Sequence, residues 1–150
     1  MAWTTSKNTE IYASSGGWKK RRKIQLDYLG HSCFLVEASD GTRILLDPYR
    51  PQALGGRIQF DAVDTHANIV AVTHYHEDHG WIGGVHGNPT VMDAAGTAHG
   101  IAFKTVTLPH DCEGGSTMGL SRMIAFEVDE IRPRVSPRTT GKDVAYAVTT

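Results

Sequence analysis

The chain has few cysteines and no long apolar run, and these shortages exclude several classes of protein. Its 150 residues include only Cys33 and Cys112, which are too few for a disulfide framework and do not form the C-x-x-C pair of a structural zinc site. No segment reaches the ~20 apolar residues that a membrane-spanning helix needs, and the first residues carry no secretory signal. These absences predict a cytoplasmic protein with reduced thiols and no membrane partner.

Positive charge is also scarce beyond the N-terminal segment. Six of the 15 Lys and Arg lie in residues 1–23, five of them in the run Lys19–Lys23, whereas 15 of the 16 Asp and Glu lie later. An acidic body of this kind argues against nucleic acid as a partner. The basic run could serve as a nucleic-acid or membrane-surface patch, but a solvated extension is the interpretation we prefer.

The hydrophobic pattern predicts one domain at residues 24–131, between a disordered basic leader at 1–23 and an irregular tail at 132–150. The continuous β-branched run at 68–73 is typical of a strand buried on both faces, so helices are expected to pack against its sheet. Residues 48–67 mix Pro, Gly and polar residues, and predict a loop region. Alternation and β-branched residues predict the other strands at 24–29, 33–37, 43–47, 90–92, 101–108 and 123–128.

Four metal-binding side chains follow the buried strand within six residues: His74, His76, Asp78 and His79. A catalytic zinc ion takes about three protein ligands and keeps one position open for water. In extended backbone His74 and His76 share one face, while Asp78 and His79 would begin a short helix and face a second metal. Surface histidines in a polar loop are the alternative interpretation. The density of ligands directly after a buried strand favours a metal site.

The segment His74–His79 resembles the H-x-H-x-D-H signature of the metallo-β-lactamase superfamily. The segments Leu29–Phe34, Ile44–Pro48 and Gly87–Val91, together with His110-Asp111, resemble the branch that includes ascorbate-6-phosphate lactonase and related zinc-dependent hydrolases. The resemblance covers residues 24–131. It implies an α/β fold, the αβ/βα sandwich of that superfamily, of which this chain would supply mainly the N-terminal, β-rich half.

The resemblance implies that His74, His76 and His110 hold one zinc ion, and that Asp78 and His79 contribute to a second. The cofactor is therefore expected to be one or two zinc ions. Zinc in such a site lowers the pKa of a bound water to about 7 and polarises a carbonyl or phosphoryl oxygen. Asp78 would be the catalytic residue that orients or deprotonates this water. The expected reaction is hydrolysis of a lactone, ester, amide or phosphodiester in a small-molecule substrate.

Other residues receive weaker or no roles from the same resemblance. Asp47, at a strand end, is expected to support the site by hydrogen bonds. His31 would lie near the metals, and the sequence leaves open whether it does more than form a turn. Cys112 is expected to be an inert packing residue. Three further histidines match no motif position and are expected at the surface: His66, His86 and His99.

The resemblance also implies later metal ligands, an Asp that bridges two metals and a further His. No Asp in a matching context follows Val128–Ile131, and His110 is the last histidine. We therefore expect a C-terminally truncated chain, and we hypothesise a frameshift near Arg132 that leaves 132–150 out of frame. Three functions stay open at this point: a zinc-dependent hydrolase, a truncated non-catalytic metal-binding fragment, and a half-domain completed by another chain, for example in a homo-oligomer.

Overall fold

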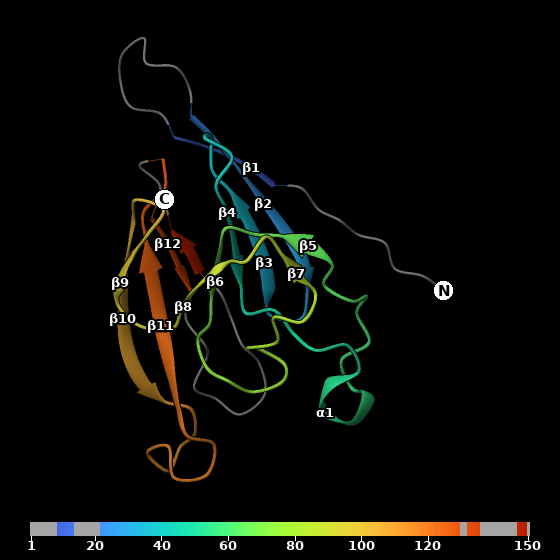
Figure 1. The fold of residues 1–150 in the computed structure, drawn as a ribbon. Helices are drawn as coiled ribbons and strands as arrows, with labels where there is room; N and C mark the ends of the chain where they lie inside the picture. Colours follow the sequence, from blue (N-terminus) through green and yellow to red (C-terminus); the bar gives the residue numbers. More distant parts are fainter. Residues whose placement is uncertain (1–8, 14–21, 130–131, 136–146, 150) are drawn as a thin grey trace.

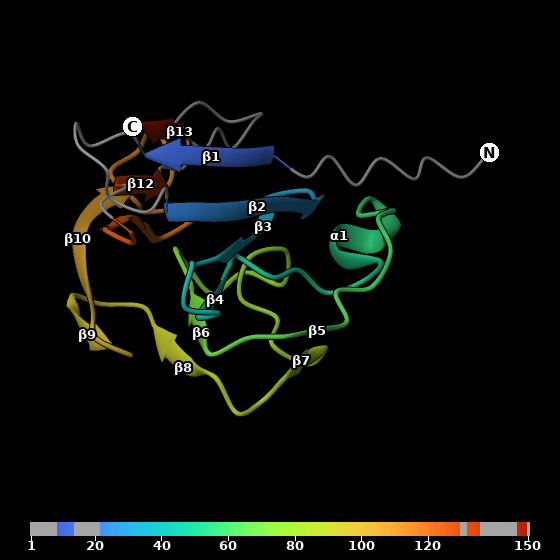
Figure 2. The same cartoon turned by 90° about the horizontal axis from the view of Figure 1, so that it is seen from above.

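Two β-sheets face each other in the computed structural model, which describes residues 9–13, 22–129, 132–135 and 147–149 (Figures 1 and 2). The strands of the first sheet are Thr9–Ala13 (β1), Arg22–Gly30 (β2), Cys33–Glu37 (β3), Arg43–Leu46 (β4), Ile69–Ala71 (β6) and Thr90–Met92 (β8), in spatial order β1-β2-β3-β4-β6-β8. Those of the second are Gly96–Ala98 (β9), Ile101–Pro109 (β10), Leu120–Phe126 (β11), Arg132–Val135 (β12) and Ala147–Thr149 (β13), in order β13-β12-β11-β10-β9. Thr65–His66 (β5) and Val85–His86 (β7) form a small third sheet, and Ala53–Gly56 is the short helix α1.

The direction of the strands in the first sheet decides where the functional side chains can meet. β2, β3 and β4 are antiparallel neighbours, so β2 and β4 run the same way. β4, β6 and β8 are mutually parallel neighbours. The carboxyl ends of β2, β4, β6 and β8 therefore lie at one edge of the sheet. The residues that follow these four strands are collected at that edge.

The main core lies between the two sheets. Alternate residues of the first sheet, among them Val36, Ile44 and Ile69, point toward the second sheet and are almost fully buried. The second sheet contributes Phe103 and Phe126, whose ring centroids lie 5.1 Å apart. Burying such side chains stabilises each by about 1.5–3 kcal/mol relative to exposure. The sequence patterns predicted these strands, and the family resemblance implied that they form a sandwich.

The other face of the first sheet is covered by a loop rather than by the helices that the buried strand predicted. Val70 and Val72 are fully buried there against Tyr49, Ile58 and other side chains of residues 48–67. The Tyr49 hydroxyl donates to the carbonyl oxygens of Leu29 at 2.9 Å and Asp61 at 2.6 Å. The apolar residues of this segment have no helical spacing, yet they supply enough surface to close the second core. α1 is the only helix among the described residues, and none there is long and apolar enough to cross a membrane.

Both ends of the described chain differ from the predicted leader and tail. Residues 9–13 form β1 against β2, and β2 begins at Arg22 rather than Ile24. Ile11 and Tyr12 favour a strand, and the run is too short to show a pattern in the sequence. β12 and β13 extend the second sheet, because the open edge of β11 offers backbone groups that even a polar segment can pair. The rest of the predicted leader and tail lies outside the described residues.

Gly84 lies where two stretches of chain approach too closely for a side chain. A Cβ at this position would lie 1.7 Å from the carbonyl oxygen of Val63, while Thr65 N donates to Gly84 O at 3.1 Å. Gly84→Ala is therefore expected to lower the free energy of unfolding by about 2–3 kcal/mol. Chemical denaturation measures the change against Gly96→Ala, whose Cβ would meet only the flexible end of Met92, at 3.2 Å. Equal stability of the two variants would contradict the close approach.

Candidate metal centre

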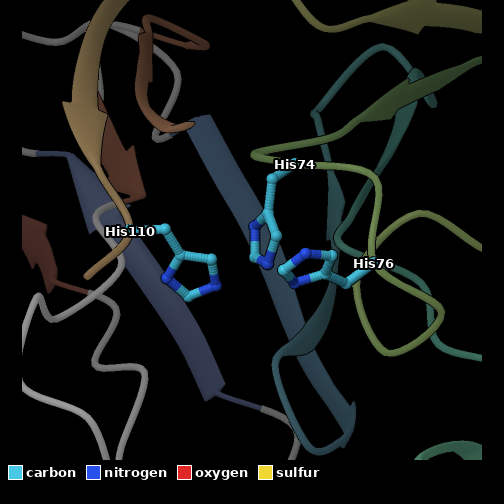
Figure 3. A group of neighbouring side chains, drawn as sticks. All are labelled: His74, His76 and His110. Carbon is cyan, nitrogen blue, oxygen red and sulfur yellow. The ribbon is translucent and has the colours of Figure 1, made fainter. Parts of the chain in front are cut away.

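Three histidines from two different elements meet at the edge where the first sheet ends. The chain leaves β6 through Thr73 into His74 and His76, and His110 follows directly after β10. The backbone N–H of Arg122 on β11 donates to Thr73 O at 3.0 Å and so ties the second sheet to this edge. Figure 3 shows the three imidazole rings turned toward one another.

The ring geometry of this trio suits a metal ion. One ligand nitrogen from each of His74, His76 and His110 lies within 4.8 Å of the others. Ring centroids are 4.7 Å apart for His74 and His76, 4.3 Å for His74 and His110, and 5.3 Å for His76 and His110. Nitrogens bound tetrahedrally to zinc lie about 3.4 Å from one another. Small side-chain rotations would therefore complete the arrangement.

His74 carries the clearest sign of a missing partner. Its Nδ1 lies 3.0 Å from Thr73 Oγ1, and that hydroxyl already donates to Asp47 Oδ2 at 2.7 Å. The hydroxyl oxygen can therefore only accept from His74, which places the proton of His74 on Nδ1 and the lone pair on Nε2. Nε2 is buried and has no hydrogen-bond partner in the described part of the chain. A buried lone pair between two other imidazoles fits a bound metal.

Asp47 supports this arrangement by hydrogen bonds, as the family resemblance implied. Its fully buried carboxylate accepts from Thr73 N at 2.7 Å, from Thr73 Oγ1 at 2.7 Å and from His79 Nδ1 at 3.1 Å. Its backbone has φ 42°, a left-handed conformation that costs energy outside glycine. The hydrogen bonds compensate for that cost. They orient His74, through the Thr73 hydroxyl, and His79 directly.

A second cluster joins Asp78 and His79 to His31. Residues 77–79 form a turn, not the expected start of a helix, because His79 N and Gly80 N both donate to His76 O. His31, in the turn between β2 and β3, places Nε2 3.1 Å from Asp78 Oδ2, and His79 Nε2 lies 3.5 Å from the same oxygen. The sequence left the role of His31 open. Its place after β2, at the same sheet edge as Asp47 and His74, was the signal that could have found it.

The family follows from a match that spans both clusters. Residues 25–133 match the family described as the beta-lactamase superfamily domain. The chain belongs to this superfamily. Among solved structures, a candidate metal-dependent hydrolase from Parabacteroides distasonis ATCC 8503 is similar, with a TM-score of 0.62 and 13% identity over 90% of this chain and 67% of that one. At this identity the likeness shows the shared metallo-β-lactamase fold, of which this chain has the β-rich part. A search of curated proteins found no match.

The loop after His110 in this superfamily domain is built around one carboxylate. Asp111 accepts four backbone N–H groups at 2.7–3.0 Å, those of Glu113, Gly115, Thr117 and Met118. These hydrogen bonds lower the pKa of Asp111 to about 2, and the bond from Met118 has the largest effect. His110 N also donates to the carbonyl of Gly119, at 3.0 Å. The loop thereby fixes the position of His110.

The remaining sequence candidates lie apart from the two clusters. Cys112 is exposed, which corrects the expectation that it packs inside the protein. Cys33 is the buried cysteine, and burial raises the pKa of its thiol well above the usual value. The three histidines expected at the surface are exposed: His66, His86 and His99.

The metal-free domain is expected to lose stability in mild acid because of His74. Burial first, and then the nearby His79, His110 and His76, lower the pKa of His74 from 6.5 to about 3. Between pH 6.5 and pH 3 the His74 imidazole is protonated in the unfolded chain but not in the folded chain. The free energy of unfolding therefore falls from pH 6.5 toward pH 3. Each pH unit in this window costs about 1.4 kcal/mol, which gives roughly 2.5–3 kcal/mol by pH 4.5.

Denaturant unfolding at pH 7 and pH 4.5 measures this loss. Asp78, whose pKa is lowered to about 2, loses its contribution only below pH 3.8, so it does not contribute to the difference between pH 7 and pH 4.5. His74→Gln is the matched variant, since it cannot titrate, and it should show a flatter profile. An equally steep loss in that variant would assign the acid sensitivity to other groups.

Proposed function

We propose that the chain is a zinc-dependent hydrolase that holds zinc with His74, His76 and His110. The observation that carries this proposal is the buried, partnerless Nε2 of His74, which faces the two other imidazoles. Three histidines with a fourth position open are a donor set of catalytic zinc sites. Zinc bound there would lower the pKa of a water to about 7 and polarise the carbonyl or phosphoryl oxygen of the group that the water attacks. The name of the Parabacteroides neighbour agrees with this activity.

Asp78 is the residue to which we assign the orientation of the attacking water. Burial raises the pKa of its carboxyl, but the hydrogen bond from His31 and the nearby His79 outweigh burial and lower it to about 2. The carboxylate is therefore ionised at neutral pH and accepts hydrogen bonds. A base of such low pKa removes protons poorly at pH 7. Orientation of the water thus fits Asp78 better than its deprotonation.

The substrate class follows from what such a site can polarise. A zinc ion would polarise a carbonyl or phosphoryl oxygen, and a positioned water would attack the carbon or phosphorus atom that carries it. We therefore propose a small-molecule lactone, ester, amide or phosphodiester. Tyr75, Trp81 and Ile82 are exposed in and just after the ligand segment and offer apolar contacts to such a molecule. The guanidinium of Arg50 lies 5.7 Å from the Trp81 ring centroid and is paired with the Glu77 carboxylate at 3.3 Å.

The experiment combines metal analysis with hydrolysis. The purified chain is dialysed against zinc, its metal content is measured by mass spectrometry, and it is offered a lactone, a nitrophenyl ester, an anilide and a bis-nitrophenyl phosphate. We expect bound zinc, and turnover of at least one probe that chelation abolishes and zinc restores. Bound zinc without turnover would favour the non-catalytic metal-binding alternative. Turnover per chain that rises with protein concentration would favour completion by a second copy. Absence of bound zinc would overturn the site.

A further inference from the structure

We infer that the substrate carries an apolar acyl chain, which packs against exposed side chains of the loops around His74, His76 and His110 (the three-histidine site). The inference rests on the proposed function, because it names the class of lactone, ester or amide that this site would hydrolyse. Among the described residues, ten large apolar side chains are exposed, and only Val91 and Val106 lie within β8 and β10. The other eight lie in or next to the loops that follow β2, β4, β6 and β10, at the edge that carries the histidines.

One apolar flank of the three-histidine site lies beside α1 and is formed by Leu54 and Trp81. The backbone N–H of Leu54 donates to Glu77 Oε1 at 2.6 Å, and Glu77 follows His76 directly in the chain. The Trp81 ring packs where a Cβ of Gly83 would lie, which fixes its position. Leu54 nevertheless stays 44% exposed and Trp81 42%. Both side chains are therefore tied to the ligand segment but left uncovered.

The other flank lies in the loop after β10 and is formed by Met118 and Leu120. The backbone N–H of Met118 donates to Asp111 Oδ2 at 2.7 Å, and Asp111 follows His110 directly in the chain. Leu120 packs against Gly115, where a Cβ would lie 2.9 Å from Leu120 Cδ2. Figure 1 shows α1 and this loop at the same end of the molecule, on opposite sides of it. A chain bound at the histidines could therefore contact apolar side chains on either flank.

The backbone of Leu54 shows that its exposure has an energetic cost. Its φ is 55°, a left-handed conformation that is unfavourable for leucine. The hydrogen bond to Glu77 holds the backbone there, yet the side chain gains no burial in return. Strain of this kind is characteristic of functional segments. We therefore assign Leu54 to ligand contact rather than to the core.

The charge around the site favours an uncharged chain over a phosphate group. Among the described residues that lie in 73–78 or hydrogen-bond to that segment, four carry a carboxylate and two carry a fixed positive charge: Asp47, Glu77, Asp78 and Asp93 against Arg50 and Arg122. These charges sum to −2, which one zinc ion would bring to zero. A neutral apolar chain meets no opposing field there, whereas a phosphate ester or an anionic lipid surface finds no excess of positive charge.

The kinetic test compares acyl chains of different length on one leaving group. The zinc-loaded protein is given nitrophenyl acetate, butyrate and octanoate below their micelle concentrations, and kcat/KM is measured for the part of the rate that chelation abolishes. We expect octanoate to exceed acetate at least about 10-fold, because each buried methylene group can contribute up to about fourfold. The octanoate-to-acetate ratio does not depend on the fraction of active protein, since both esters use the same sample.

Matched variants locate the contact with the chain. Leu54→Asn should lower the octanoate-to-acetate ratio about 3–10-fold, because asparagine accepts the left-handed backbone but is polar. Met118→Gln keeps the length of the side chain and should lower the ratio similarly. Val106→Thr is the control, since Val106 is exposed within β10 and its variant keeps the branched shape. A ratio that falls equally in all three variants would refute the proposed contacts.

A binding measurement needs neither zinc nor turnover. Octanamide is titrated into the protein and followed by methyl NMR, with the Leu54 and Met118 signals assigned from their variants. We expect saturable shifts of both signals, no shift of the Val106 methyl groups, and no effect of acetamide. Such shifts without hydrolysis of any ester would support the acyl-chain contacts and refute the proposed hydrolase.

The opposite result separates the two ideas in the other direction. Zinc-dependent hydrolysis with equal kcat/KM for acetate and octanoate, and no shift with octanamide, would refute the acyl chain and leave the hydrolase standing. Without octanamide shifts, sedimentation with phosphatidylcholine vesicles would assign the apolar side chains to a lipid surface. Dimerisation that Leu54→Asn abolishes would assign them to a second copy of the chain. Either assignment overturns the inference.

Discussion

His76→Ala is expected to lower the affinity of the three-histidine site for zinc by at least about 100-fold. Loss of a residue that merely supports a ligand typically costs 10–100-fold in affinity, so removal of a ligand should cost at least the upper value. Hydrolysis should fall with it, because the remaining two imidazoles no longer hold the ion that activates water. Calorimetric zinc titration and turnover of the best probe substrate measure the two effects.

His76 is the most informative of the three histidines to remove, since it is the one exposed on the structure. The fold uses its backbone rather than its ring, because His79 N and Gly80 N donate to the His76 carbonyl. Alanine keeps that carbonyl, so lost zinc would report on the ligand and not on unfolding. His86→Ala is the matched control, an exposed histidine whose contact is with Asp64 at 2.6 Å. Unchanged zinc affinity in His76→Ala would refute the assignment of this site.

The sequence predicted the residues of the candidate metal centre more fully than their arrangement. The close spacing of histidines and an aspartate in His74–His79 indicated the candidate ligand segment. The pattern of apolar residues predicted most strands of the sandwich. His110 was assigned only through a family resemblance, because nothing near it in the sequence marks it as a ligand. What brings it to His74 is the tie between Arg122 on β11 and Thr73. Contacts between distant segments of this kind depend on how the two sheets pack.

The directions of the paired strands explain where the second cluster forms. Gly30, Leu46, Ala71 and Met92 end β2, β4, β6 and β8, and pairing places all four ends at one edge. The polar residues that follow each of them do contribute there, Asp93 by accepting from the Tyr75 hydroxyl at 2.7 Å. The role of His31 was left open because the sequence shows where strands end but not which strands become neighbours.

The prediction that helices cover the face of the first sheet away from the second sheet was wrong for a physical reason. A strand buried on both faces requires apolar cover, and helices are its commonest source beside parallel strands. Here Tyr49 and Ile58 supply it from a loop whose apolar residues have neither helical nor strand periodicity. The periodicity of apolar residues indicates helices and strands, whose backbone is regular. It does not indicate a loop that buries single side chains at irregular intervals.

Asp47→Ala is expected to lower the free energy of unfolding by about 3–5 kcal/mol. The substitution leaves Thr73 N, the Thr73 hydroxyl and His79 Nδ1 without the acceptor that they share, in a fully buried place. Each buried donor left unpaired costs about 1–3 kcal/mol. Alanine also accepts the backbone angle of φ 42° less readily than aspartate or asparagine. Urea denaturation of the metal-free protein measures the loss.

Asp47→Asn separates the carboxylate from the backbone angle. Asparagine keeps the left-handed conformation and one acceptor oxygen, but its amide group meets a donor where the second carboxylate oxygen accepted. It should therefore recover part of the stability that alanine loses. It should still lower zinc affinity about 10–100-fold, because the tautomers of His74 and His79 are both set through this carboxylate. An Asp47→Asn protein with wild-type zinc affinity would show that the carboxylate does not set these tautomers. A loss below about 1 kcal/mol in Asp47→Ala would show that its three donors find other partners.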